Sequence, residues 1–194
     1  MTVPIDAFDR TVETRTMEGY RRDFLADPDI AAFFHGNVNV GPLLGDDEIV
    51  SPPQINISLL PGDVYEVGTG GVVKDRLPIY VKAYFPPELK SYRIGGRNPH
   101  DVVARLIMIV TRGSIDPCTG LVNDNGYVLD PDWPVPPPPI PTPYDPLRWL
   151  TTHLYGCSKQ AALLVPPDKP RFLLIPFAID AETKLNPLTR ERMN

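Results

Sequence analysis

A cysteine and a histidine in the last quarter of the chain are of the types that nucleophilic catalysis uses. Cys157 follows His153 by four residues, so a helix would place the thiol and the imidazole on one face. An imidazole that activates a neighbouring thiol is the basis of cysteine-dependent hydrolysis. No third group that would orient the imidazole is identifiable in the sequence. A Cys157/His153 hydrolase therefore stays an alternative, and a buried thiol near an ordinary histidine is the favoured interpretation.

Residues that bind metals or cofactors are not grouped in any familiar spacing. Segment 121–132 resembles a calcium loop in part, but its first residue is Leu121 and its last is Asp132, which do not fit the required acid and glutamate. The acidic run 46–48 is predicted to be a solvated loop and the glycine-rich run 68–71 a hairpin turn. The histidines and cysteines are scattered and form no zinc-binding pair: His35, His100, His153, Cys118 and Cys157. We expect no catalytic residue, no metal and no cofactor.

Interfaces are the better prediction for the conspicuous side chains. Segment 90–97 combines three cations with a tyrosine and two glycines, which suits contact with an acidic protein face, another subunit or nucleic acid. A solvated loop is the simpler alternative for it. Aromatic residues also flank or follow the proline-rich run 134–146 and favour burial. The candidate interface residues are Lys90, Tyr92, Arg93, Arg97, Trp133, Tyr144 and Trp149.

Proline is the outlier of the composition. The chain has 25 prolines among 194 residues, whereas a usual chain has about 5%. Residues 134–146 (PVPPPPIPTPYDP) are predicted to form an extended polyproline arm. Because prolines lower the entropy lost when an extended segment is fixed, such an arm suits an ordered strut along a neighbouring subunit. A proline-rich adaptor that binds an aromatic groove is a second alternative.

The charge distribution bears on the class of partner. The formal net charge is −5, so the protein as a whole is not expected to bind nucleic acid tightly. Residues 51–113 carry eight bases and five acids, so this middle part could contact an acidic surface, including that of another copy. No apolar run is long enough to span a membrane and no basic, apolar leader is present, so we expect synthesis in a cytoplasm with reduced thiols.

Helical periodicity appears in three places, with a fourth that is weaker. Pro28 must end the first helix, Asp27 can cap the second, and Gly36 can stop it. Asn98 and Pro99 begin a buried helix that Gly113 ends. The predicted helices are 9–26, 28–34 and 99–112, and residues 147–162 are predicted to be partly helical.

Strands are predicted between and after these helices. Segment 77–85 (LPIYVKAYF) alternates most clearly, shorter alternating runs occur at 38–40 and 55–59, and the apolar residues Val64, Val67 and Val72 follow, in a meander of short strands. Segment 171–179 (RFLLIPFAI) is predicted to be the last strand, at an edge or with a bulge because of Pro176. No internal repeat is visible in the sequence. The predicted fold class is therefore α+β, with a mostly antiparallel sheet flanked by helices and a Pro-rich extended insertion.

The predicted organisation has three parts. Residues 1–112 form an α+β ring-forming core, residues 113–170 a Pro-rich extension or insertion, and residues 171–194 a closing strand and C-terminal tail. The order is an N-terminal helix, a corner (DPDIAAFF), strands including PPQINISLL and LPIYVKAYF, a helix (HDVVARLIMIV) and the strand RFLLIPFAI. This order and texture resemble the tail-terminator and head-tail joining proteins of long-tailed bacteriophages, over residues 10–112 and 171–180.

The resemblance implies a function in assembly instead of catalysis. Members of that family are small α+β proteins that form hexameric rings at the phage neck, where they cap the tail tube and join it to the head. It implies a homo-oligomer, with the tail tube and the head-completion or connector proteins as partners, and a virion location after synthesis in the host cytoplasm. DNA would pass through the lumen without specific binding, which a mildly negative lumen favours. No catalytic residue and no membrane association come with the resemblance.

Overall fold

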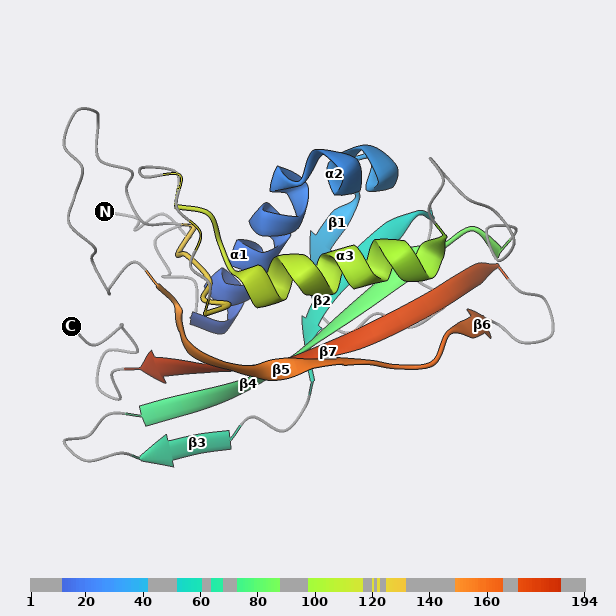
Figure 1. Cartoon of the computed structure of the whole chain (residues 1–194). Helices are drawn as coiled ribbons and strands as arrows, with labels where there is room; N and C mark the ends of the chain where they lie inside the picture. Colours follow the sequence, from blue (N-terminus) through green and yellow to red (C-terminus); the bar gives the residue numbers. More distant parts are fainter. Residues whose placement is uncertain are drawn as a thin grey trace, which may run out of the picture.

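The computed structural model describes residues 12–41, 52–60, 64–67, 73–87, 98–116, 120, 122, 125–131, 149–165 and 171–185. Within this part the three helices lie on one face of a single sheet (Figure 1). The helices are α1 (Val12–Ala26), α2 (Pro28–Phe34) and α3 (Pro99–Arg112). The strands are β1 (Val38–Val40), β2 (Gln54–Leu59), β3 (Val64–Val67), β4 (Val73–Phe85), β5 (Thr151–Lys159), β6 (Leu163–Val165) and β7 (Phe172–Leu185).

The two longest strands, β4 and β7, form the centre of the sheet. They are antiparallel, with Ile79 opposite Ile179. On the outer side of β4 lie β2 and β3, and on the outer side of β7 lie β5 and β6, all antiparallel to their long neighbour. β1 adds to β2 as the single parallel pair. The expected α+β class with a mostly antiparallel sheet is confirmed.

The topology contains a repeat that the sequence does not show. In each half a helix precedes two short strands, and both short strands pair with the one long strand that follows them. The first half is α1 with β2, β3 and β4, and the second half is α3 with β5, β6 and β7. Corresponding residues follow from the registers: Ile57 lies opposite Val81 in the first half, and Cys157 lies opposite Ile179 in the second.

A proline in each long strand marks where its short partners are interrupted. The carbonyl of Pro78 in β4 accepts from Leu60 N–H at 2.8 Å, and the carbonyl of Pro176 in β7 accepts from Gln160 N–H at 3.0 Å. In an antiparallel pair the same residue would return a second bond through its own N–H, which proline lacks. Pairing with β2 and β5 therefore ends at these prolines, and β3 and β6 pair further along.

The prediction of an edge position or bulge for Pro176 is thus wrong in one respect. β7 is central, because β4 pairs along its other side, with Lys82 opposite Pro176. Proline is tolerated there because its missing donor points to the gap between β5 and β6. The strand also extends to Leu185, beyond the predicted end at residue 179.

The main core fills the space between the helices and the sheet. From β4 it receives alternate residues such as Ile79 and Val81, and from β7 Ile175 and Phe177, all fully buried. α1 contributes Tyr20 and Phe24. The helix termini are as predicted where described: the Asp27 carboxylate accepts from the N–H groups of Asp29 and Ile30, and α3 has a capping box between Asn98 and Asp101.

The partial helix predicted for 147–162 is wrong. Residues Thr151–Lys159 form β5, and residues 163–165 form β6, both in the same sheet as β4. Adjacent β-branched residues Thr151 and Thr152 and the aromatic Tyr155 favour a strand, and the long neighbour β7 supplies the ladder. The segment predicted as an extension thus supplies two strands of the sheet. The Pro-rich run 134–146 lies outside the described residues.

Candidate interaction surfaces

Most of the predicted interface residues lie outside the described part of the chain: Lys90, Tyr92, Arg93, Arg97, Trp133 and Tyr144. Trp149 is described, and it is buried, with 7% of its surface exposed. Its backbone forms an isolated antiparallel bridge to Leu129. Within this chain Trp149 therefore serves to hold segment 125–131 against the start of β5.

The structure does not bring Cys157 and His153 together. β5 has irregular register between Leu154 and Gly156, and an extra residue in a strand reverses which face the following side chains take. Cys157 packs against the main core on the helix side. The His153 ring instead lies edge-on to Tyr155, whose hydroxyl donates to Glu182. The predicted shared face for the thiol and the imidazole is wrong: a regular strand would also place residues four apart on one face, but the extra residue at Tyr155 shifts Cys157 to the opposite face from His153.

The environment of Cys157 also opposes nucleophilic chemistry. Burial raises the pKa of its thiol to about 11, from an ordinary 9.0, so the thiolate is scarce at neutral pH. No opposite charge lowers that pKa among the causes that act on it. Burial raises the pKa of the neighbouring Tyr20 as well, and its hydroxyl has no hydrogen-bond partner in the described structure. The Cys157 thiol and the Tyr20 ring are therefore part of the hydrophobic core.

Neither a metal site nor a membrane-spanning helix is found in the described part of the chain. Among the described residues, no three histidine, cysteine or acidic side chains are grouped so that they could hold a metal ion. No described helix has both the length and the apolar character needed to cross a bilayer. The segments 46–48 and 68–71 and residues 121, 123, 124 and 132 lie outside the described residues.

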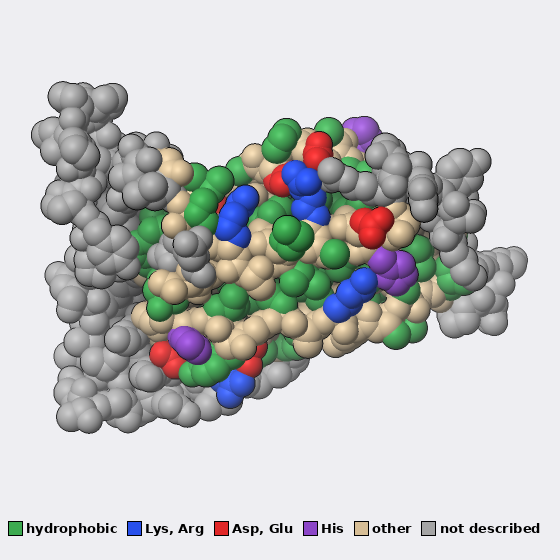
Figure 2. All heavy atoms as spheres, viewed as in Figure 1, with side chains coloured by type: hydrophobic (Ala, Val, Ile, Leu, Met, Phe, Trp, Pro, Cys, Tyr) green, Lys and Arg blue, Asp and Glu red, His purple; other side chains and the backbone are tan. Residues whose placement is uncertain are grey.

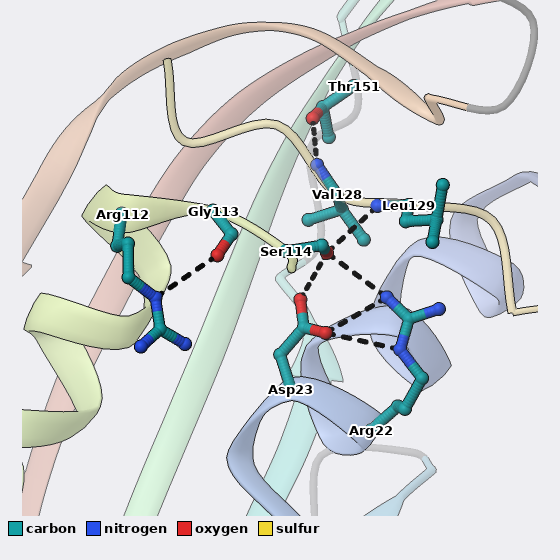
Figure 3. Close-up of polar contacts among 8 residues, drawn as sticks. All are labelled: Arg22, Asp23, Arg112, Gly113, Ser114, Val128, Leu129 and Thr151. Carbon is teal, nitrogen blue, oxygen red and sulfur yellow. Dashed lines mark hydrogen bonds and ion pairs between the residues drawn. The ribbon is translucent and has the colours of Figure 1, made fainter. Parts of the chain in front are cut away.

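A buried polar cluster joins the two halves of the fold at Ser114 (Figure 3). The Ser114 hydroxyl donates to the Asp23 carboxylate and accepts from Arg22 Nη2 at 3.1 Å and from Leu129 N–H at 2.9 Å. Burial raises the pKa of Asp23, and the neighbouring Arg22 and the Ser114 hydroxyl oppose that rise. Nearby, Thr151 Oγ1 accepts from Val128 N–H at 2.8 Å. The cluster ties α1 to the segment that precedes β5, and its hydroxyl is saturated by partners within the chain.

A second polar group lies on the sheet face away from the helices. Arg76 of β4 donates from Nε to Asp180 Oδ1 of β7 at 2.8 Å, and its guanidinium stacks over the Tyr155 ring with 4.8 Å to the centroid. Glu182 accepts from the hydroxyls of Tyr155 and Thr152. These contacts link three adjacent strands, β4, β7 and β5. This group was not predicted, because the last strand was predicted to end at residue 179, although Asp180 and Glu182 continue its alternation between buried and outward-facing residues.

The outer surface of α3 has a shallow apolar hollow of about 700 Å³. Met108 lines it and is 67% exposed. Arg105 lies at its rim, where Nε donates to the Asp27 carboxylate at 2.9 Å and Nη1 lies 3.2 Å from Asp29. Partial burial tends to raise the pKa of Asp27, but the hydrogen bond from Arg105 and those from backbone N–H groups outweigh it and lower that pKa below its ordinary value. The face seen in Figure 2 likewise shows hydrophobic side chains interspersed with charged ones.

The two edges of the sheet differ in how far their backbone groups are satisfied. At the β1 edge, Arg21 Nε donates to the outward-facing Val38 carbonyl at 2.7 Å. At the β5 edge, the start of the strand is covered by segment 125–131, where Leu150 N–H donates to the Val128 carbonyl at 2.7 Å. The later part of the same edge, at Cys157 and Lys159, makes no outward backbone hydrogen bond in the described structure.

Comparison with known proteins gives no family. No protein-family model matches the chain, and no curated protein matches it. The fold and the surfaces described above are therefore the grounds for a functional conclusion.

Proposed function

We propose that this protein is a structural virion protein of a bacteriophage neck or tail, a terminator-like subunit that acts by contact with other copies of itself. It would form a homo-oligomeric ring, a hexamer in the resembled family, that caps the tail tube and joins it to the head-completion or connector proteins. DNA would pass through the lumen without specific binding. No bond would be made or broken on the protein.

The observation that carries the proposal is the unlike character of the two sheet edges. A closed ring is built from heterologous contacts, in which two different surfaces of each subunit meet. The β1 edge is short and partly covered by Arg21, whereas the β5 edge leaves backbone groups at Cys157 and Lys159 unpaired in the described structure. A subunit whose two edges differ, one short and partly covered and the other open, is suited to head-to-tail contact, and an open edge favours association.

Two further observations support the proposal. The elements on which the resemblance rests, a helix, a corner, strands, a second helix and a closing strand, occur in that order in the described residues, with β5 and β6 added before the closing strand. The described titratable clusters at Asp23 and at Glu182 have their hydrogen-bonding groups occupied by partners within the chain. These arrangements suit stabilisation of a subunit and not turnover of a substrate.

The test is the mass and shape of the purified full chain. Size-exclusion chromatography with light scattering should give a mass several times that of one chain, and negative-stain images should show closed rings with a central opening. A chain that remains monomeric at all concentrations and ionic strengths would contradict the proposal. The Cys157/His153 hydrolase finds no support in the geometry, and the Pro-rich adaptor stays a prediction, since residues 134–146 are outside the described structure.

A further inference from the structure

We propose that this chain is built as a fused dimer: the half from α1 to β4 and the half from α3 to β7 are two α–β–β–β units that meet as two subunits would. The interface between them is the β4–β7 seam, the antiparallel pair at the centre of the sheet with the helix contacts above it. The edge of β4 that faces β7 is then a surface that fits one kind of partner, a second α–β–β–β unit. The inference does not depend on the proposed ring.

The strand that follows each helix pairs with its long strand in an equivalent register. In the first half Ile57 of β2 lies opposite Val81 of β4, and in the second half Cys157 of β5 lies opposite Ile179 of β7. Val81 and Ile179 are 98 positions apart (179 less 81). This offset along the long strands is the first term of the comparison.

The other short strand of each half gives the same offset independently. Val64 of β3 lies opposite Arg76, and Leu163 of β6 lies opposite Leu174. Arg76 and Leu174 are again 98 positions apart (174 less 76). One constant offset along the long strands therefore superimposes both short strands, so the likeness extends beyond the order of elements to the hydrogen-bond ladders.

The seam itself obeys the offset. Pro78 of β4 lies opposite Asp180 of β7, and Lys82 of β4 lies opposite Pro176 of β7. The offset converts Pro78 into Pro176 and Lys82 into Asp180, so it exchanges these two pairs with each other. An antiparallel pair with this property has a two-fold axis perpendicular to the sheet, midway between the two pairs. That is the relation between the subunits of a symmetric dimer.

The helices follow the same axis. α1 contacts β2 of its own half, and α3 contacts β5 and β7 of its own half. α1 begins on the side of the sheet where β7 ends, and α3 begins on the side where β4 ends (Figure 1). A two-fold axis perpendicular to the sheet leaves both helices on one face and exchanges these two ends, as observed. Among the described residues, α2, β1 and segment 125–131 have no counterpart in the other half and are additions to the common unit.

A weak sequence similarity accompanies the offset. Residues 77–83 read LPIYVKA, and residues 175–181 read IPFAIDA. The proline and the last alanine are identical, and every inward-facing position in both segments is a fully buried apolar residue. Conserved turns and caps are not shared, which is why the sequence shows no repeat until the registers align it.

The chemistry of the seam is that of an obligate interface. Its centre is apolar, with Ile79 opposite Ile179 and both fully buried. Polar contacts surround that centre: Arg76 Nε donates to Asp180 Oδ1 at 2.8 Å on one face of the sheet, and the Ser114 cluster joins the halves on the other. An apolar centre with a polar rim is typical of contacts between subunits, and obligate interfaces resemble a domain core cut in half.

Cleavage of the folded full chain between the halves tests the seam. A protease recognition sequence is inserted between Gly95 and Gly96, and the matched control has it between Asp46 and Asp47, inside the first unit. We expect the chain cut at Gly95 to keep the elution volume and circular dichroism spectrum of the uncut chain. It should regain both after unfolding in urea and dilution, because each fragment holds a complete unit. The control cut separates α1 from β2 and should lower the recovery.

The melting temperature gives a second readout. Once cut at Gly95, the fold is a complex of two chains, so its stability depends on protein concentration. A tenfold change in concentration corresponds to about 1.4 kcal/mol. We therefore expect the melting temperature of the cut chain to rise by about 3 to 6 °C per tenfold rise in concentration, beyond any rise in the uncut chain. Fragments that separate on cutting, or that recover no better than the control, would overturn the proposal.

A circular permutant tests the same point without cleavage. Residues 96–194 are placed before residues 1–95, which reverses the order of the halves and leaves both intact. The two-fold axis places the end of β7 as close to α1 as the end of β4 is to α3, so the joined termini have room to connect them. We expect the spectrum and melting temperature of wild type, and a lower melting temperature for a permutant that begins at Asp47. The reverse order of the two permutants would overturn the proposal.

These outcomes are separate from those of the proposed function. If wild type forms rings but neither the cut chain nor the permutant refolds, the fused dimer is refuted and the ring function stands. If both refold but the wild-type chain never associates with other copies, the fused dimer is supported and the ring is contradicted.

Discussion

The two halves of the sheet have the same arrangement of strands but differ in what lies along their outer edges. Each has a long strand with a proline, Pro78 or Pro176, and two short strands on its outer side that meet at that proline. In the first half β1 pairs with residues Ile55–Ile57 of the outer edge. In the second half segment 125–131 covers only the start of the edge, and Cys157 and Lys159 have no partner there in the described structure.

This difference shows how one topology can supply both a closed and an open surface. At corresponding positions, Ile57, which lies beside β1, is fully buried in the main core, whereas Cys157 is half-buried. The side chain beneath an open edge must tolerate two states, exposed in the single chain and covered in an assembly. A small residue that is only weakly polar meets that requirement better than a large aliphatic one.

The largest effect is expected where the two halves are joined, at Ser114. Ser114→Ala would remove the hydroxyl donor to Oδ2 of the buried Asp23 carboxylate, leaving Arg22 on Oδ1, and would leave the Leu129 N–H without its acceptor. We expect the free energy of unfolding to fall by about 3 kcal/mol, measured by urea denaturation. Ser158→Ala, at an exposed position of β5, is the matched control and should change the free energy of unfolding by less than about 0.5 kcal/mol.

The loss in Ser114→Ala should depend on pH in a known direction. Burial raises the pKa of Asp23 in the folded protein above its ordinary value of 3.8, and loss of the hydroxyl donor raises it further. A raised folded pKa means that stability declines as pH rises from the unfolded value through the folded one. The deficit should therefore be smallest below pH 3.8 and full at neutral pH, and a deficit that grew on acidification would contradict this account.

The next effect tests how closely α1 approaches the segment that precedes β5. A Cβ on Gly19 would lie 2.3 Å from Val128 Cγ1 and 3.2 Å from the Leu129 carbonyl oxygen. In an open helix the change from glycine to alanine stabilises by about 1 kcal/mol, but here we expect Gly19→Ala to destabilise the fold by about 2 kcal/mol. Chemical denaturation of Gly19→Ala and of the wild type would measure this change in the free energy of unfolding.

A shortened neighbour should relieve the clash. In Gly19→Ala/Val128→Ala the added methyl group occupies space that the valine has vacated. The double variant should therefore lose less stability than the sum of the two single variants, by about 1 kcal/mol or more. Strict additivity would mean that α1 and segment 125–131 are not in close contact, and the two halves would then be joined by the Ser114 cluster without this close approach.

Local signals in the sequence were sufficient for the helices. Asn98, Pro99 and Gly113 bound α3 at the predicted residues, and Asp27 caps α2 as predicted, because capping depends on neighbouring residues alone. The open edge could not be predicted in this way. Whether β5 is a strand, and which of its residues face outward, depends on β7 and on the position of Pro176, which are distant in the sequence.

The polar sites show the same limit. His153 and Cys157 have a spacing that suits a helical face, yet an irregularity in β5 places them on different faces of the sheet. Asp180 and Glu182 continue an alternation that was visible in the sequence, and extending the last strand by that alternation would have located their group. The Ser114 cluster has no such signal, because it joins residues about 90 positions apart in sequence.

The smallest effect concerns the thiol at the open edge itself. With a pKa of about 11 against an ordinary 9.0, Cys157 should react with iodoacetamide at pH 7 about a hundredfold more slowly than a free thiol. In a Cys118→Ser background, mass spectrometry would follow Cys157 alone, and the rate should rise with pH up to about 11. His153→Ala should leave that rate unchanged, because the imidazole lies on the other face of the sheet.

The same measurement distinguishes the open edge from the closed one. Since Ile57, which lies beside β1, is fully buried, the corresponding Cys157 should become less reactive if the proposed ring places another copy against this edge. We expect the labelling rate in the assembled wild-type chain to fall at least about tenfold below that of the dissociated chain. Fast labelling at neutral pH that His153→Ala abolished would instead return the hydrolase to consideration, and an equal rate in both states would indicate that the edge stays open in the assembly.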